Sequence, residues 1–214
     1  MRKLISPVVA IVLMLSLTVP VFATTIDDFV EKAAGEVGTT YEMTPGDKYH
    51  INEELKYGKW FNDQRSPLER FWNGSYYDHE APWCVMFVSW CSAQVGLGIP
   101  RYSDVTEMKN WYISEGRYHD WQSYNPKKGD TVFFMRNGED SHVGIIESVE
   151  NLPDVPFKDG KWIKLTVIEG DCVHMGDGWK NCSVDRVSRE IRTSQPETWM
   201  TSSSSNVIVG FGEN

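Results

Sequence analysis

Three side chains of this sequence could together cleave an acyl bond: the thiol of Cys84, the imidazole of His142 and the carboxylate of Glu169. A cysteine attacks a carbonyl carbon once a base has taken its proton, and a third polar group orients that base. Asp171 follows Glu169 by two residues, so strand alternation would put both carboxylates on one face, from which either could reach the imidazole. His79 is an alternative base, but its polar surroundings predict a loop. The pattern indicates covalent catalysis through a thioester.

The segment that carries Cys84 is typical of a helix. Its apolar residues recur at the spacing of one helical face, at positions 84, 87, 88, 91 and 95. Pro82 suits a first turn, and Gly96 predicts the end of the helix. Cys84 would then lie at the N-terminal end, where free N–H groups favour a thiolate and the Cys84 backbone N–H could bind an oxyanion. From the helix alone, the alternative is that Cys84 and Cys91 are two buried small hydrophobic residues.

The order of the remaining elements predicts helices first and strands after them. We expect helices over residues 27–37, 84–95 and 104–115, and strands near 130–135, 142–149, 163–169, 186–191 and 206–211. Helices followed by consecutive strands are typical of an α+β fold with an antiparallel sheet. Cys84, His142 and Glu169 would then each lie at the end of an element.

Five separated segments resemble those of CHAP (cysteine- and histidine-dependent amidohydrolase/peptidase) domains of bacterial wall hydrolases. In chain order they are PWCVMFVSWC, PKKGDTVFF, SHVGIIESV, VIEGD and IVGFG, and the upstream YGKWF is similar to the YGxWY segment of that family. The resemblance runs from about residue 26 to 212 and implies a papain-like arrangement, with the nucleophile helix packed on the sheet. It implies Cys84 as nucleophile, His142 as base and Glu169 as acid. Asp171 stands where the family usually has asparagine, which leaves open which acid contacts the imidazole.

The resemblance also implies a substrate, bacterial peptidoglycan, cleaved between muramic acid and L-alanine or within the stem peptide or cross-bridge. This chemistry needs no metal or other cofactor; some relatives hold calcium, but the sequence has no Asp-rich loop of the calcium-binding type. Two other functions are compatible with the same residues. One is a secreted wall-associated binding protein on an inactive hydrolase fold, and the other is an acyltransferase that passes the acyl group to an amine.

Aromatic residues crowd the stretch before Cys84 and could form one wall of a substrate groove. The candidates for that wall are Trp60, Trp72, Tyr77 and Trp83. Packing of these rings in the core is the alternative.

The N-terminus is typical of a secretory signal peptide. A basic start at Arg2 and Lys3 precedes an apolar run, and residues 21–23 fit a cleavage site. We therefore expect residues 1–23 to be removed and residues 24–214 to form one catalytic domain, secreted to the bacterial wall or medium without stable membrane association. An uncleaved membrane anchor is the alternative. The net charge of −9 and the lack of a basic cluster argue against nucleic acid as a partner.

The four cysteines divide into two pairs. Cys84 and Cys91 would lie about 10.5 Å apart along one helix, whereas a disulfide requires Cα atoms within about 7 Å. Cys172 and Cys182 flank a Gly-rich turn, so we expect them to form a disulfide across a hairpin in an oxidising compartment. A metal site is the alternative, built from Cys172, His174, Asp177 and Cys182, although that spacing matches no common zinc pattern.

Overall fold

A computed structural model describes residues 25–42, 55–63, 83–153, 162–176, 179–192 and 207–214. The helices within these ranges are α1 (Ile26–Ala34), α2 (Lys56–Asp63), α4 (Cys84–Val95) and α5 (Val105–Ser114). The strands are β1 (Thr40–Glu42), β2 (Tyr118–Asp120), β3 (Thr131–Arg136), β4 (Glu139–Asn151), β5 (Trp162–Gly176), β6 (Trp179–Arg192) and β7 (Val207–Gly212).

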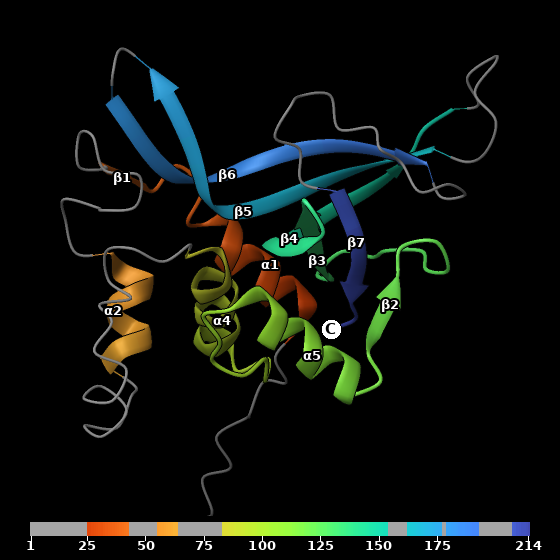
Figure 1. Ribbon diagram of the computed structural model, residues 1–214, viewed down its shortest axis with the longest axis horizontal. Coiled ribbons are helices and arrows are strands. Elements are labelled where there is room, and N and C mark those ends of the chain that lie inside the picture. Colours follow the sequence, from red (N-terminus) through yellow and green to blue (C-terminus); the bar gives the residue numbers. More distant parts are fainter. Residues whose placement is uncertain (1–24, 43–54, 64–82, 154–161, 177–178, 193–206) are drawn as a thin grey trace, which may run out of the picture.

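The strands form one antiparallel sheet in the order β1-β6-β5-β4-β3-β7-β2. Strands β3 to β6 follow one another as neighbours, and β7 returns to the free side of β3. Helices α1, α4 and α5 lie together on one side of this sheet (Figure 1). The predicted α+β, papain-like fold is therefore confirmed, with the helix that begins at Cys84 packed against β4 and β5.

Two helices begin at side-chain caps that the sequence carries. The Thr25 hydroxyl accepts the Asp28 N–H at 3.1 Å, and the Asp28 carboxylate accepts the Thr25 N–H at 2.8 Å, which is a capping box at the start of α1. Asp104 caps α5 by accepting the Glu107 N–H at 2.9 Å. Helix α1 ends at Ala34, three residues before the predicted end at position 37.

Helix α4 is buried on all sides from Cys84 to Ser92. Its predicted bounds are confirmed, and Gly96 ends it with a left-handed φ of 73°. The prediction of a single apolar face is wrong, because every residue from Cys84 to Ser92 is buried. A Cβ atom at Gly170 of β5 would lie 2.7 Å from the Trp83 ring and 2.9 Å from Phe87 Cβ, so glycine there lets the helix start close to the strand.

The sheet carries a hydrophobic cluster on each face. Phe133 of β3 belongs to the cluster beneath the helices, whereas its neighbours Val132 and Phe134 belong to a second cluster with Leu165 and Val167 of β5. This alternation along β3 is that of a strand buried on both sides. Both faces of the central strands are thus packed, which holds β4 and β5 in place. Glu169 lies within β5, so the prediction that it ends a strand is wrong.

Candidate active site

Cys84 is the first residue of α4, and its side chain is fully buried and interacts with the ring of His142. The helix begins without a side-chain cap, since Trp83 at the cap position offers no acceptor. The N–H groups of a first helical turn have no partner within the helix. The thiol therefore lies beside these donors, which can stabilise a negative charge on the oxygen of a bound carbonyl group.

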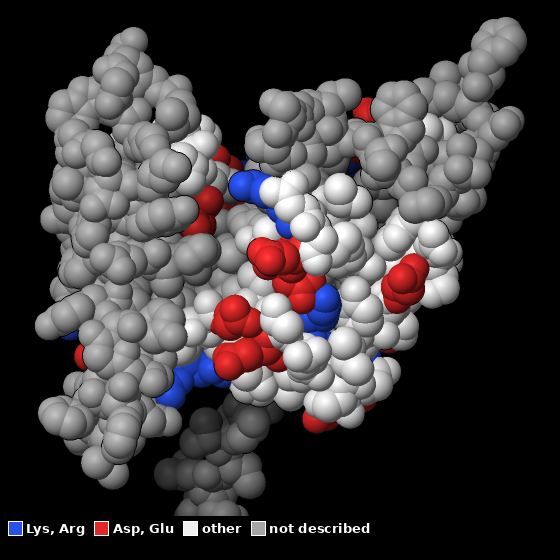
Figure 2. All heavy atoms as spheres, viewed as in Figure 1, with Lys and Arg blue, Asp and Glu red and all other residues white. Residues whose placement is uncertain are grey.

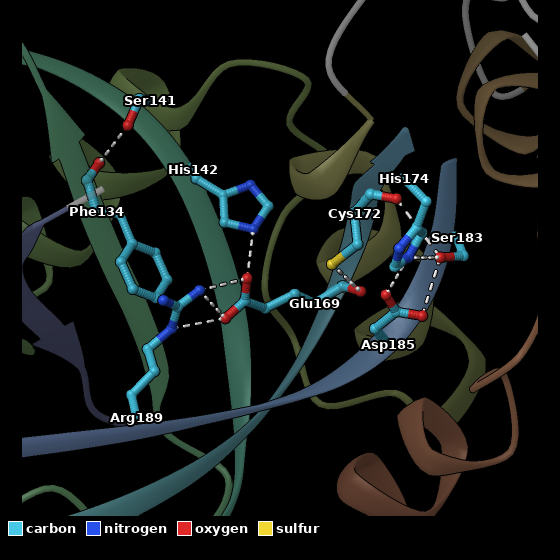
Figure 3. A network of polar contacts seen from close by, with 9 residues as sticks. All are labelled: Phe134, Ser141, His142, Glu169, Cys172, His174, Ser183, Asp185 and Arg189. Carbon is cyan, nitrogen blue, oxygen red and sulfur yellow. Dashed lines mark hydrogen bonds and ion pairs between the residues drawn. The ribbon is translucent and has the colours of Figure 1, made fainter. Parts of the chain in front are cut away.

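His142 lies on β4 beside Glu169 of the neighbouring strand β5, and both side chains are buried. His142 Nε2 is 3.0 Å from Glu169 Oε2 (Figure 3). Nδ1 is therefore the ring nitrogen left for Cys84. Burial by itself lowers the pKa of His142, but the charge and hydrogen bond of Cys84, together with the Glu169 carboxylate, raise it overall. This arrangement favours the imidazolium, the form that can pair with a thiolate and later protonate a leaving group.

Gly144 of β4 leaves the space through which Glu169 reaches His142. A Cβ atom at Gly144 would lie 2.9 Å from Glu169 Cγ and 2.6 Å from Val167 Cγ1. Carbon atoms in contact lie about 3.5–4.0 Å apart, so no side chain fits there without displacing one of these groups. The glycine in the segment SHVGI thus has a steric role in the site.

Arg189 of β6 is a member of the site that sequence reasoning missed. Its guanidinium donates to Glu169 Oε1 from Nε at 3.0 Å and from Nη2 at 2.6 Å, and Nη2 also donates to Oε2 at 2.8 Å. The guanidinium also lies 4.6 Å from the centre of the Phe134 ring. Burial by itself raises the pKa of Glu169, but His142 and Arg189 lower it overall, so the carboxylate is ionised.

Asp171 differs from Glu169 in its backbone and in its partner. A bulge interrupts the pairing of β5 with β6 between Glu169 and Cys172, and Asp171 has a left-handed φ of 62°. Its side chain lies near the backbone of Trp83, just before the nucleophile helix. Burial raises the pKa of Asp171 to about 7, while the nearby His142 opposes this rise. The simple alternation that we expected for the two acids is therefore wrong, because the bulge lies between them.

A second polar cluster lies further along the hairpin of β5 and β6 (Figure 3). His174 Nε2 is 2.9 Å from Ser183 Oγ and 2.5 Å from Asp185 Oδ2. One ring nitrogen thus faces both partners. In a Ser-His-Asp catalytic triad the serine and the acid contact different ring nitrogens, so this cluster does not have the geometry of a triad. Within the described ranges, no group of three or more His, Cys, Asp or Glu side chains could hold a metal ion. Asp177, a member of the alternative metal site, lies outside those ranges.

The disulfide predicted between Cys172 and Cys182 is not formed in this structure, where both are free thiols. Cys172 is paired with Ser183 and Val173 with Cys182, so the two cysteine side chains leave opposite faces of the hairpin. Cys182 is buried with its sulfur 3.8 Å from the Tyr41 carbonyl oxygen, whereas Cys172 approaches the Glu169 carbonyl oxygen at 3.6 Å. The hairpin predicted from the sequence is present, but its register places Cys182 one residue away from the position opposite Cys172. Cys84 and Cys91 are also free, as their spacing predicted.

The aromatic residues predicted to line a substrate groove differ in how deeply they are buried. Trp83 is 1% exposed and stacks on Tyr57 at 5.2 Å between ring centres, so this residue is core and its assignment to a groove wall is wrong. Trp60 of α2 is half-buried and packs against the same core. Trp72, Tyr77 and the alternative base His79 lie outside the described residues, as does the predicted signal peptide.

Among the helices of the described part, none has both the length and the apolar character needed to cross a membrane.

Comparison with protein families agrees with this geometry. The family model of the CHAP domain matches residues 75–171, a span that contains Cys84, His142 and Glu169. Residues 75–171 therefore form a CHAP domain, the domain of cysteine- and histidine-dependent amidohydrolases and peptidases. Strands β6 and β7 and helices α1 and α2 lie outside the matched span, which is shorter than the resemblance drawn from the sequence. A comparison with curated proteins gave no match, and neither did one with solved structures.

Proposed function

We propose that this chain is a secreted hydrolase that cleaves amide bonds of bacterial peptidoglycan through a thioester. The bond is either the N-acetylmuramoyl-L-alanine amide or a peptide bond of the stem or cross-bridge. The main support is the connected series of Cys84, His142 and Glu169, brought together from α4, β4 and β5. Thiol, imidazole and carboxylate in this order match the nucleophile, base and orienting group of acyl transfer.

The proposed reaction has two half-reactions. His142 takes the proton of Cys84, and the thiolate attacks the amide carbonyl, whose oxygen becomes negative near the N–H groups that begin α4. The imidazolium then protonates the leaving amine as the C–N bond breaks, and the acyl group remains on sulfur. Water, deprotonated by His142, attacks the thioester and releases a carboxylic acid and the free thiol. Glu169 stabilises the imidazolium in both half-reactions.

The distribution of charge supports a substrate that is not a polyanion such as nucleic acid. The chain has a net charge of −9, and on the face in Figure 2 the described basic side chains are scattered among acidic ones. A protein of this charge does not gain affinity for nucleic acid from its overall field. Secretion is proposed from the basic and apolar pattern of residues 1–23, and we propose residues 24–214 as the single catalytic domain.

Digestion of purified peptidoglycan, followed by mass spectrometry of the released fragments, tests this function. We expect the protein to release fragments whose new amino and carboxyl ends identify the bond that is cut. Cys84→Ala should abolish the release while the fold is retained. Cys91→Ala is the matched control on the same helix and should cost about 1 kcal/mol of stability and keep the activity. Hydrolysis by Cys84→Ala at the rate of the unmodified protein would overturn the mechanism.

The same assay separates the two alternatives. With an added amine, an acyltransferase would form fragments that carry the amine, whereas a hydrolase would mostly release free acids. A binding protein on an inactive fold would release no fragments, and its Cys84 would not be labelled by a thiol-reactive amide that reports an activated nucleophile.

A further inference from the structure

We infer that Arg189 is a positioning residue of this site, which keeps Glu169 ionised and aligned so that Glu169 can orient His142. The inference rests on the proposed function, because it assigns Arg189 a part in the same reaction. Arg189 lies on β6, beyond the span that the family model matches.

The contact between Arg189 and Glu169 has the geometry of an aligned ion pair. Nε and Nη2 of Arg189 share the two carboxylate oxygens through three hydrogen bonds of 2.6–3.0 Å. The planar guanidinium matches the planar carboxylate, so the pair restricts rotation as well as position. Glu169 Oε2, which accepts Nη2 at 2.8 Å, also lies 3.0 Å from His142 Nε2, so one carboxylate oxygen joins the guanidinium to the imidazole.

Because Glu169 is buried, it needs the positive charge of Arg189 to remain ionised. The side chains of Glu169 and Arg189 are only 3% and 15% exposed. A buried carboxylate without a partner tends to take up a proton. In the proposed reaction His142 alternates between imidazolium and neutral imidazole, so its charge is absent in part of the cycle. The guanidinium keeps its charge throughout, and it therefore keeps Glu169 ionised when His142 is neutral.

Phe134 of β3 fixes the other side of the guanidinium. Its ring centre lies 4.6 Å from the Arg189 guanidinium and 5.6 Å from the His142 ring centre. A guanidinium favours the face of an aromatic ring, and contact on that face limits the motion of a long side chain. Arg189 is thus held by an aromatic ring and by a carboxylate at once, which is the support that an aligned site requires.

The same strand carries a matched ion pair outside the site. Arg186 of β6 donates to Glu147 of β4 from Nε at 3.0 and 2.8 Å and from Nη2 at 2.9 Å, and the Arg186 side chain is 46% exposed. The residue types are the same as for Arg189 and Glu169, and Nε and Nη2 again share the carboxylate through three hydrogen bonds. Exposed pairs of this kind contribute little to stability. Arg186→Met therefore controls for loss of an arginine from β6.

The test measures kcat/KM on a peptidoglycan fragment across pH for Arg189→Met, Arg189→Lys and Arg186→Met. We expect Arg189→Met to lower kcat/KM by about 10- to 100-fold, because a misplacement of 1 Å can cost that much. Its acid limb should also move to higher pH, since Glu169 without the cation takes up a proton at higher pH. Arg189→Lys, which keeps the charge but not the fork, should keep the acid limb near its original pH and recover part of the rate. Arg186→Met should stay within about twofold of the unmodified protein.

A loss in Arg189→Met with an unmoved acid limb would overturn the inference, because a purely structural role lowers the rate without altering the titration. An equal loss in Arg186→Met would overturn it as well. If Arg189→Met does not fold, Arg189→Gln keeps a hydrogen-bond donor without the charge and should show the same shift. The pH dependence of Cys84 alkylation by iodoacetamide, followed on the Cys84 peptide by mass spectrometry, reports the same shift without substrate. A protein inactive on peptidoglycan whose alkylation still responds to Arg189→Met would refute the proposed function alone.

Discussion

Gly144→Ala changes no group that takes part in the chemistry, and it should nevertheless impair the site. The added Cβ atom would lie 2.6 Å from Val167 Cγ1, 2.9 Å from Glu169 Cγ and 3.1 Å from the Ile168 carbonyl oxygen. Carbon contacts need about 3.5–4.0 Å. Relief of the contacts with Val167 and Glu169 therefore requires displacements of the order of 1 Å, in a region where both strands are buried and packed on either face.

The expected loss of stability and the expected loss of activity differ in size. Overpacking of a buried site costs about 1–3 kcal/mol of unfolding free energy. Glu169 Cγ is one bond from the carboxylate that lies 3.0 Å from His142, so its displacement lengthens that contact directly. A misplacement near 1 Å can cost about 100-fold in rate. We therefore expect the loss of kcat/KM to exceed what the loss of stability explains, since the protein remains folded at the assay temperature.

Urea denaturation and kcat/KM on a peptidoglycan fragment measure the two effects on the same preparation. Gly35→Ala is the matched control, because Gly35 has an ordinary helical backbone and its added Cβ would be no closer than 3.4 Å to another atom. That variant should lie within about 0.5 kcal/mol of the unmodified protein and keep its rate. Unchanged stability and unchanged kcat/KM in Gly144→Ala would refute the steric reasoning, because they would mean that the strands move apart at no cost.

Three further predictions concern other parts of the molecule. Burial in the native state favours protonated Asp171, so the free energy of unfolding should fall as pH rises from about 4 to about 7. Asp171→Asn should remove this fall, as measured by urea denaturation across pH, and should retain most activity. An unaltered dependence of stability on pH in that variant would contradict the burial argument. Tyr57→Phe removes the hydroxyl that donates to the buried Glu36 carboxylate at 2.9 Å, and should cost about 1–3 kcal/mol in the same denaturation assay, whereas an equally stable variant would show that the bond is dispensable. Alkylation of the unreduced, denatured protein should add four groups by intact mass; two would mean that Cys172 and Cys182 form the bridge after all.

Helices α1, α4 and α5 and the main strands could be predicted because their signals are local, whereas α2 was missed. Helix α4 has an apolar run that ends at Gly96, and α5 begins at the cap residue Asp104, so both were placed within one residue of their observed bounds. Strands β1 and β2 have three residues each and were missed, since they exist only through pairing with β6 and β7. Strands β5 and β6 are longer than predicted, because pairing continues beyond the bulge after Glu169.

The residues that tune the site were harder to find than those proposed to carry out the chemistry. Arg189 is one of 21 basic residues in the chain, and nothing in its local sequence marks it. Its link to Glu169 depends on the side-by-side arrangement of β5 and β6 and on the reach of a long side chain across them. Trp83 gave the opposite error, because an aromatic residue beside a nucleophile suggested a groove, whereas its ring completes the core beneath α4.

By itself, the sequence determined the type of chemistry and the elements that carry it, because reactivity depends on residue type and because caps, turns and periodicity act over a few residues. Only the tertiary structure decided which side chains contact one another. A bulge in β5 placed Glu169 at the imidazole and Asp171 near the start of α4, and an offset of one residue separated Cys172 from Cys182. The physical reason is that strand register depends on the packing of both faces of the whole sheet. A shift of one residue moves a side chain to the opposite face without any change in the local pattern.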